Sequence, residues 1–414
     1  MATLMEKTLR GLKNLLKRIH YSIPAKVRNI YWPVFHSCQR WFRKHLDAIF
    51  PSMVLYEGHE PNSQEPLSFV YSGDIHEMHN YFDHFMLNDG FTKRALGRRF
   101  FWRVIPEIKR DFPSCGFLIM EQSTLTIPFL QGKPGFPIPV WVTTEIDIGP
   151  AMPELFARQR SDIERLIRKN RLSVEMTKDP QCFKDFYYNM FVPYVTQRYT
   201  DTAMIVSYEG FLKTVPTSEM LLIKKDDKTI AGAVVEFRDR KPPMLCRLGI
   251  VDSNLEYVRF GAIGAIYYFL VQELKKRGYN LVDTGNTRPL LSDGLTRYKQ
   301  ALGARPCQKN FQQHSCIKFM VLQNSEGVRG FLTHNPFLFK DGKKQLCLAL
   351  FVEDKGELMT KALNAALTSS FCSGCEETRM YVFGDRNLPE DRVCSNGRPI
   401  CFESAEELIR EFRS

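Results

Sequence analysis

Five side chains lie where they could carry proton-transfer chemistry. Glu145 and Asp147 end one apolar run, Asp283 ends another, and Tyr298 and Lys299 stand side by side in the later stretch DGLTRYK. A carboxylate can act as a general base, a Tyr hydroxyl can protonate a leaving group, and a Lys can neutralise phosphate or a developing oxyanion. Each also has a purely structural interpretation. Acids at strand ends cap helices or form ion pairs, and Lys299 could be an ordinary surface lysine next to a packed Tyr298.

A predicted helix between these residues has a start that suits phosphate. Apolar residues recur every three or four positions after Ala262, and Gly278 stands where a C-cap is expected. The first amides of a helix have no intrahelical acceptor and its dipole makes that end positive, so Gly261 and Gly264 would let a pyrophosphate approach. The alternative is that the small residues only permit tight packing of the helix on a sheet. The predicted phosphate-binding residues are Arg259, Gly261, Ala262 and Gly264.

The order of elements around this helix is strand, strand, strand, helix, strand, helix, strand. Three apolar runs at 220–225, 229–238 and 244–251 read as a meander, since turn residues separate them. A short strand follows Gly278, and a second helix begins around Gly294. This order resembles the GNAT-type acyltransferase domain.

The resemblance extends upstream. The segment TEIDIGPAMPELFARQRSDIERLIRKNRLSVEM (144–176) is similar to the stretch that joins the two halves of Fem-type peptidoglycan-bridge aminoacyltransferases, and FKDFYYNMFVPYVTQRY (183–199) resembles their next helix. KKDDKTIAGAVVEF and DTGNTRPLLSDGLTRYKQALGA complete a pattern that also occurs in bacterial GNAT-like N-acyltransferases. The likeness covers residues 68–322. It implies an α/β (α+β) fold of two tandem GNAT-like halves with mixed, splayed sheets, the acyl donor at the second half and the acceptor between them.

Length and composition fit several domains, because 414 residues with 44% hydrophobic content can build more than one core. The expected organisation is a basic amphipathic helical segment at 1–60, a first GNAT-like half at 61–180 and a donor-binding second half at 181–323. A small α/β module of unknown role follows at 324–414, with strands at 345–352 and 379–383 and helices at 357–369 and 404–412.

The resemblance implies an N-acyltransferase that moves an acyl group from acyl-CoA, as co-substrate, to an amine of a small molecule or cell-envelope precursor, with no metal in the chemical step. The expected catalytic residues are Asp283, Tyr298, Lys299 and Glu145. One alternative is an aminoacyl-tRNA-dependent transferase acting on a lipid-linked acceptor. It is disfavoured because no long heptad stretch, as in the Fem-type coiled-coil arm, interrupts 181–323. Another is a non-catalytic GNAT-fold binding protein. No DNA partner is predicted.

Most of the +11 net charge lies in the first 50 residues, where ten Lys or Arg face two acids, 10 − 2 = +8. Leucines alternate with basic residues there, and aromatics follow, which is typical of a helix pair in an anionic bilayer interface. A solvated basic face and an RNA contact are the alternatives. Charges interrupt every apolar run, so neither a signal peptide nor a transmembrane helix is predicted. The expected location is cytoplasmic, peripheral at the inner face of the membrane.

Eleven cysteines without an export signal indicate mostly buried or free thiols in a reducing compartment. Four of them fall in one short stretch, and two pairs of thiolates could bind a tetrahedral zinc. The second pair is separated by six residues, more than zinc sites usually use, so ordinary thiols are the leading interpretation. The four cysteines are Cys372, Cys375, Cys394 and Cys401.

Overall fold

The computed structural model describes residues 46–73, 79–123, 125–130, 133–149, 154–200, 203, 205–307, 316–353, 361, 364, 371, 374–384, 393–395 and 398–413. Most of the predicted basic segment at 1–60 therefore lies outside the described residues. The protein has a mixed α/β fold, and the described residues build three sheets that each combine parallel and antiparallel neighbours. The chain divides into two compact units, one of Met1–Ile138, Ser315–His334 and Ser404–Ser414, the other of Pro139–His314 and Asn335–Glu403.

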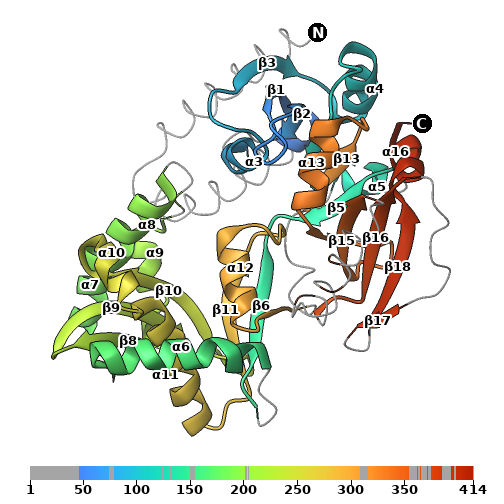
Figure 1. The fold of residues 1–414 in the computed structure, drawn as a ribbon. Helices are drawn as coiled ribbons and strands as arrows, with labels where there is room; N and C mark the ends of the chain where they lie inside the picture. The colour runs from blue at the N-terminus through green and yellow to red at the C-terminus, as the bar shows by residue number, and fades with distance from the viewer. Residues whose placement is uncertain are drawn as a thin grey trace, which may run out of the picture. The chain divides into compact units, whose positions relative to one another are not determined.

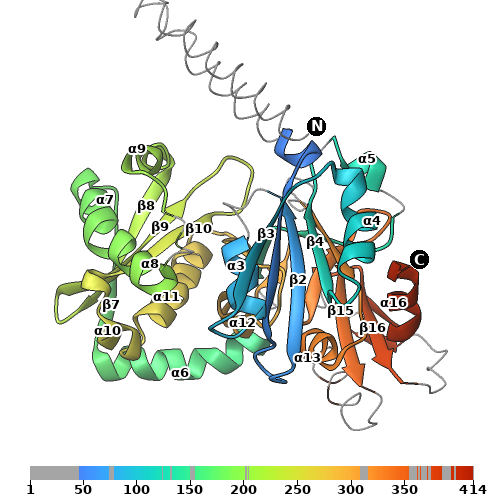
Figure 2. The same ribbon diagram turned by 90° about the horizontal axis from the view of Figure 1, so that it is seen from above.

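The first unit contains a six-stranded sheet in the order β3-β1-β2-β4-β13-β5. Its strands are β1 (Ser52–His59), β2 (Pro66–Gly73), β3 (Thr92–Arg98), β4 (Phe117–Glu121), β5 (Phe136–Pro139) and β13 (Cys316–Val321). The helices of this unit are α3 (His79–Met86), α4 (Phe101–Asp111), α5 (Ile127–Leu130), α13 (Glu326–His334) and α16 (Ala405–Arg413). Figures 1 and 2 show α4 and α5 next to one another.

The second unit contains a seven-stranded sheet in the order β12-β6-β11-β10-β9-β8-β7 and a five-stranded sheet in the order β14-β15-β16-β18-β17. The seven strands are β6 (Val142–Asp147), β7 (Leu172–Thr177), β8 (Ser218–Lys225), β9 (Lys228–Glu236), β10 (Met244–Ile250), β11 (Leu281–Thr287) and β12 (Arg305–Pro306). The other five are β14 (Phe337–Lys340), β15 (Leu346–Glu353), β16 (Glu377–Phe383), β17 (Val393–Ser395) and β18 (Arg398–Ser404).

Helices surround the seven-stranded sheet. They are α6 (Glu154–Asn170), α7 (Pro180–Phe186), the π-helix η1 (Tyr187–Phe191), α8 (Val192–Tyr199), α9 (Tyr208–Leu212), η3 (Val215–Thr217), η4 (Val251–Ser253), α10 (Leu255–Arg259), α11 (Ala262–Lys276) and α12 (Gly294–Ala301). Both ribbon views place α6 beside α11.

The predicted meander is confirmed as β8, β9 and β10, which are antiparallel neighbours. Its first turn contains Asp226 and Asp227 at φ values of 47° and 64°. A two-residue loop with both residues at positive φ is the type I′ hairpin, whose twist matches that of the paired strands, and aspartate tolerates this conformation.

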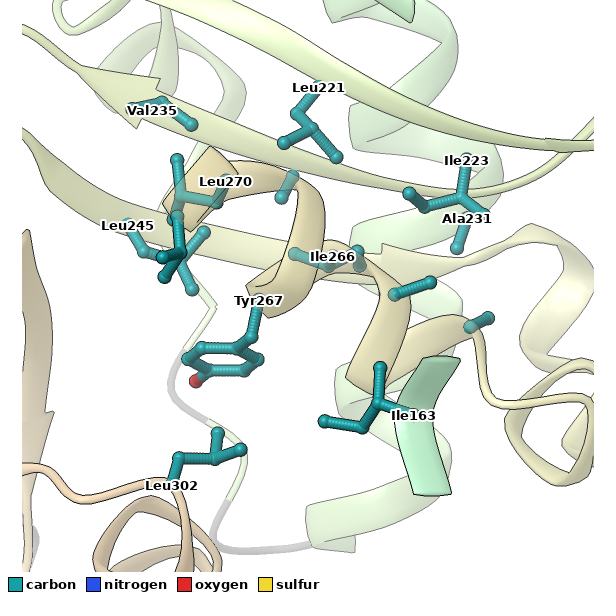
Figure 3. Close-up of a cluster of buried hydrophobic side chains, with 14 of the residues drawn as sticks. Ile163, Leu221, Ile223, Ala231, Val235, Leu245, Ile266, Tyr267, Leu270 and Leu302 are labelled. Atoms are coloured by element: carbon teal, nitrogen blue, oxygen red, sulfur yellow. The ribbon is translucent and has the colours of Figure 1, made fainter. Parts of the chain in front are cut away.

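The predicted helix is confirmed as α11, and its apolar stripe forms the centre of the second unit's core. Ala262, Ile266, Leu270 and Leu274 are buried, and they pack with side chains of β8 and β9 such as Leu221. Figure 3 shows this cluster, with the ring of Tyr267 on the side of α11 that faces Leu302. Gly278 has a φ of 81°, as a glycine ending the helix requires.

The compact units differ from the domain boundaries expected at residues 180 and 323. The strands β6 and β7 and the helix α6 belong to the seven-stranded sheet's unit, whereas β13 pairs with β4 in the first. The expected C-terminal module is divided too: its strands β15 and β16 lie in the second unit and α16 in the first. Its expected helix at 357–369 falls mostly outside the described residues. Alternating hydrophobicity identifies a strand but does not say which neighbour it joins.

Candidate active site

The strands β10 and β11 run parallel and separate after a single ladder pair, Met244 with Asp283. Irregularities follow in both strands, between Leu245 and Arg247 and between Asp283 and Gly285. Gly285 has a φ of 76°, and a Cβ placed on it would lie 3.3 Å from the carbonyl oxygen of Leu245. The paired ends are the amino-terminal ends, so the two strands form a wedge, the β10–β11 wedge, that opens toward their carboxyl ends.

The start of α11 lies at the same edge as the wedge opening, because a crossover helix begins where its preceding parallel strand ends. The chain passes from Ile250 through η4 and α10, and Gly261 then forms the N-cap of α11 at a φ of 93°. The first-turn amides of α11 are donors without intrahelical acceptors. Arg259 is exposed just before them.

The predicted glycine pair also has a packing role. A Cβ on Gly261 would lie 2.9 Å from Cβ of Leu166, and one on Gly264 would lie 3.0 Å from Cγ1 of Ile163. Both partners belong to α6, so the missing side chains let α6 and α11 approach one another. Ala262 is fully buried in the core. The space beside these glycines is therefore occupied by a helix, and backbone amides are what this end of α11 offers a ligand.

Asp283 is buried and fully engaged. One carboxylate oxygen accepts a 2.6 Å hydrogen bond from Nη2 of Arg238, and the other accepts a 2.8 Å bond from the backbone N–H of Gly285. Arg238 also donates to the carbonyl oxygen of Pro242 at 3.1 Å. These bonds fix the β11 backbone at the point where the wedge begins.

Lys299 projects from α12 into the interior and is 3% exposed. Its Nζ donates to the carbonyl oxygens of Gly285 and Asn286 at 3.1 and 2.9 Å. Burial lowers the pKa of Lys299 to about 7, although the charges of Asp283 and Asp293 act in the opposite direction. A neutral amine has two N–H donors, which match the two carbonyl acceptors. Lys299 thus bonds the bulged part of β11, where that strand has left β10.

Tyr298 is half-buried and belongs to a group of tyrosines from α8, α11 and α12. Its ring meets that of Tyr267 at a centroid distance of 5.7 Å. Burial raises the pKa of Tyr298 above its usual range, so its hydroxyl remains protonated at neutral pH. Nearby, Nη1 of Arg198 donates to the hydroxyl of Tyr194 at 2.7 Å.

Glu145 lies opposite Asp283 in the β6–β11 ladder, so the structure brings two of the predicted acids together. Its side chain is 17% exposed, and Oε1 lies 3.4 Å from Nη2 of Arg305. Asp147, two residues on, instead accepts a 3.0 Å bond from the backbone N–H of Gly149. Of the three candidate bases, Asp283 is buried and bonded at both oxygens, whereas Glu145 and Asp147 are partly exposed.

Three residues of this region escaped sequence reasoning. Arg238 lies 45 residues from its partner Asp283. The hydroxyls of Thr144 and Thr284, 2.8 Å apart, tie β6 to the bulge of β11. The one sequence signal near Arg238 is the Pro242-Pro243 pair, which restricts the backbone there. Nothing in the residue spacing predicts which of these side chains bond to one another.

The four cysteines for which zinc was the less favoured interpretation are only partly described. Cys372 and the side chain of Cys394 lie outside the described residues. Cys375 is buried in a hydrophobic cluster that includes Phe371 and Leu346, and Sγ of Cys401 lies 3.7 Å from Oε2 of Glu377. Within the described residues no group of three or more His, Cys, Asp or Glu is arranged to hold a metal.

No described helix is long and apolar enough to span a bilayer.

No protein-family model and no curated protein matches the sequence. The solved structures to which parts of this chain are similar include L-PGS from Bacillus licheniformis, at 9% identity over 67% of this chain and 84% of that one, with a TM-score of 0.33. A tandem GNAT protein from the clavulanic acid biosynthesis pathway is 12% identical over 58% of this chain and 78% of its own, with a TM-score of 0.26. The C-terminal domain of a putative lysylphosphatidylglycerol synthetase from Agrobacterium fabrum is 11% identical over 57% and 68%, with a TM-score of 0.28.

Proposed function

We propose that the protein is an N-acyltransferase of the GNAT type and that the β10–β11 wedge holds an acyl-CoA donor. The supporting observation is the single Met244–Asp283 pair, beyond which β10 and β11 no longer serve as ladder partners. Backbone groups of separated strands need other hydrogen-bond partners. The pantetheine arm of CoA carries two amides, and an extended chain with amides can bond to strand edges as an added strand does.

The phosphates of the donor would lie at the first turn of α11, where helix amides and the exposed Arg259 favour negative charge. This assignment relies on backbone groups, since the spaces beside Gly261 and Gly264 are filled by α6. The thioester would then lie deeper in the wedge, toward β6 and α12.

The reaction forms a bond between the acceptor nitrogen and the acyl carbon and breaks the carbon–sulfur bond of the thioester. Glu145 takes the proton that the amine must lose, and Tyr298 gives a proton to the departing thiolate. Asp283 and Lys299 act as positioning residues, because their polar atoms already bond to Arg238 and to the backbone of β11. The acceptor is an amine of a small molecule or of a cell-envelope precursor.

Donor binding tests the proposal directly. Isothermal titration of the full-length protein with CoA, acetyl-CoA and longer acyl-CoAs should give saturable binding, and Arg259→Ala should weaken it about 5- to 10-fold by removing one phosphate contact. Arg240→Ala is the matched control, since Arg240 is a 93% exposed arginine of the same unit.

Two results would redirect the proposal. Binding of an aminoacyl-tRNA with no response to any CoA ester would move the donor to the aminoacyl-tRNA class. Binding of CoA esters without acyl transfer to any of a panel of amines would leave a GNAT-fold binding protein.

A further inference from the structure

The first unit carries a continuous run of aromatic rings that leads from its interior to its surface at α4 and α5. Phe50 contacts Phe100 at a centroid distance of 5.0 Å, and Phe100 stacks on Trp102 at 4.6 Å. Phe101 contacts both Trp102, at 5.1 Å, and Phe129, at 5.6 Å. Figures 1 and 2 show the two helices side by side.

The outer members of this run are exposed. Trp102 is 55% exposed and Phe129 is 69% exposed, and Leu125 and Ile127 beside Phe129 are 44% and 38% exposed. Phe101 and Leu130 anchor the same two helices in the core. Exposed large apolar side chains gathered on two adjacent short helices are unusual, because single ones are normally scattered, and they mark a contact surface.

Basic residues outnumber acidic ones on and beside these two helices. Arg103 and Arg110 on α4 are 61% and 68% exposed, and Lys133 follows α5. Two acids lie among them: Arg103 pairs with Glu107, which is 12% exposed, and Arg110 pairs with Asp111, which is 45% exposed. Partial burial and the charge of Lys133 both lower the pKa of Lys109, so like charges lie close together here. The rim of the patch therefore favours an anionic partner.

We infer that Trp102, Leu125, Ile127 and Phe129 form a docking surface for an anionic lipid membrane. Exposed aromatic and aliphatic side chains enter the headgroup region, while surrounding Lys and Arg contact lipid phosphates. The chain before residue 51 supports this choice, because it is strongly basic and joins the unit at Phe50, the inner end of the aromatic run. A basic segment is repelled by a basic rim, whereas an anionic surface attracts both.

Vesicle binding of the full-length protein tests the inference. Vesicles of phosphatidylcholine with about one-third phosphatidylglycerol should bind the wild type at about 0.1 M salt, and phosphatidylcholine alone should bind it weakly. Trp102→Ala combined with Phe129→Ala should weaken binding about 10-fold or more, because two largely exposed aromatic side chains are lost. The matched control, Leu255→Ala with Tyr188→Ala, removes two similarly exposed apolar side chains of the second unit and should bind like wild type.

Fluorescence locates the contact. Replacing Trp32, Trp41 and Trp141 by Phe leaves Trp102 as the single tryptophan of the four in the sequence. Its emission should shift to shorter wavelength when anionic vesicles are added, with circular dichroism checking the fold.

Three outcomes would overturn the inference. Equal vesicle binding by the Trp102→Ala/Phe129→Ala variant would place any membrane contact elsewhere, residues 1–45 included. Emission that is already blue-shifted without vesicles and unchanged by them would mean that part of the chain or a second copy covers the patch. Equal binding to neutral vesicles would remove the role of the basic rim.

Discussion

Lys299 donates to the carbonyl oxygen of Gly285 at 3.1 Å, and this bond joins α12 to the bulge of β11. The same Nζ reaches the next carbonyl, that of Asn286, at 2.9 Å. In a regular sheet such carbonyls bond to a neighbouring strand, but β10 has already separated. The Gly285 carbonyl also accepts a 3.0 Å bond from Oγ1 of Thr144 on β6, so the buried amine and a threonine together satisfy this group.

The pH dependence of stability should reveal this amine. The pKa of Lys299 is lowered to about 7 in the folded protein, against an ordinary 10.5. Between these values the unfolded chain binds more protons than the folded one, so the free energy of unfolding rises with pH through that window. Lys299→Met removes this contribution. Its destabilisation relative to wild type should therefore be larger at pH 9.5 than at pH 7.5, by on the order of 2 kcal/mol.

Denaturant titrations at the two pH values measure this difference. Lys276→Met is the control, because Lys276 is 74% exposed on α11. A destabilisation by Lys299→Met that is equal at both pH values would contradict the lowered pKa.

Asp283 and Glu145 lie opposite each other on the neighbouring strands β11 and β6. Replacing each carboxylate by an amide should nevertheless have different effects on stability and turnover. Asp283→Asn leaves Arg238 without its buried carboxylate partner, so the free energy of unfolding should fall by about 3 kcal/mol. Glu145→Gln should change stability by less than about 1 kcal/mol, since its ion pair is longer and partly exposed. It should lower kcat at least 100-fold if Glu145 removes the amine proton.

Thermal unfolding and release of free CoA from acyl-CoA give the two readouts. Loss of kcat in Asp283→Asn with unchanged stability would reverse the two assignments.

Local patterns were enough to predict the elements but not the partners of the site. The spacing of Ile266, Leu270 and Leu274 defines α11 because a helix buries one face, and Asp226-Asp227 defines a hairpin because few residues tolerate positive φ. The family resemblance predicted a splayed sheet, and the single Met244–Asp283 pair confirms it.

The hydrogen bonds that decide each side chain's role could not be predicted from local sequence patterns. Lys299 was expected to neutralise phosphate or a developing oxyanion, yet its acceptors are backbone carbonyls 13 and 14 residues earlier. Those acceptors lie in a bulge of β11, and no residue type predicts a bulge unambiguously. Likewise, the glycines of α11 were compatible with a phosphate or with close packing, and only the position of Ile163 and Leu166 shows that packing fills the space beside them.

Gly249 should tolerate substitution far less than Gly264. A Cβ on Gly249 would lie 2.5 Å from the backbone carbon of Met190 in the π-helix η1, and backbone cannot move aside without unpacking that helix. Gly249→Ala should cost more than about 2 kcal/mol. At Gly264 the nearest atom is Cγ1 of Ile163 at 3.0 Å, a movable side chain, and alanine's better helix propensity offsets the crowding. Gly264→Ala should therefore stay within about 1 kcal/mol of wild type, and equal losses in denaturant titrations would refute this account.

Tyr298 should matter for turnover more than for binding. Its pKa is raised by burial, which keeps the hydroxyl protonated for donation to the leaving thiolate, and its ring is held against Tyr267. Tyr298→Phe preserves the ring packing and removes only the donor, so kcat should fall about 10- to 100-fold while donor affinity stays within about 2-fold. Tyr268→Phe, at the residue that follows Tyr267 on α11, is the control and should leave kcat unchanged. A fall in donor affinity with unchanged kcat would instead make Tyr298 a binding residue and require another proton source for the thiolate.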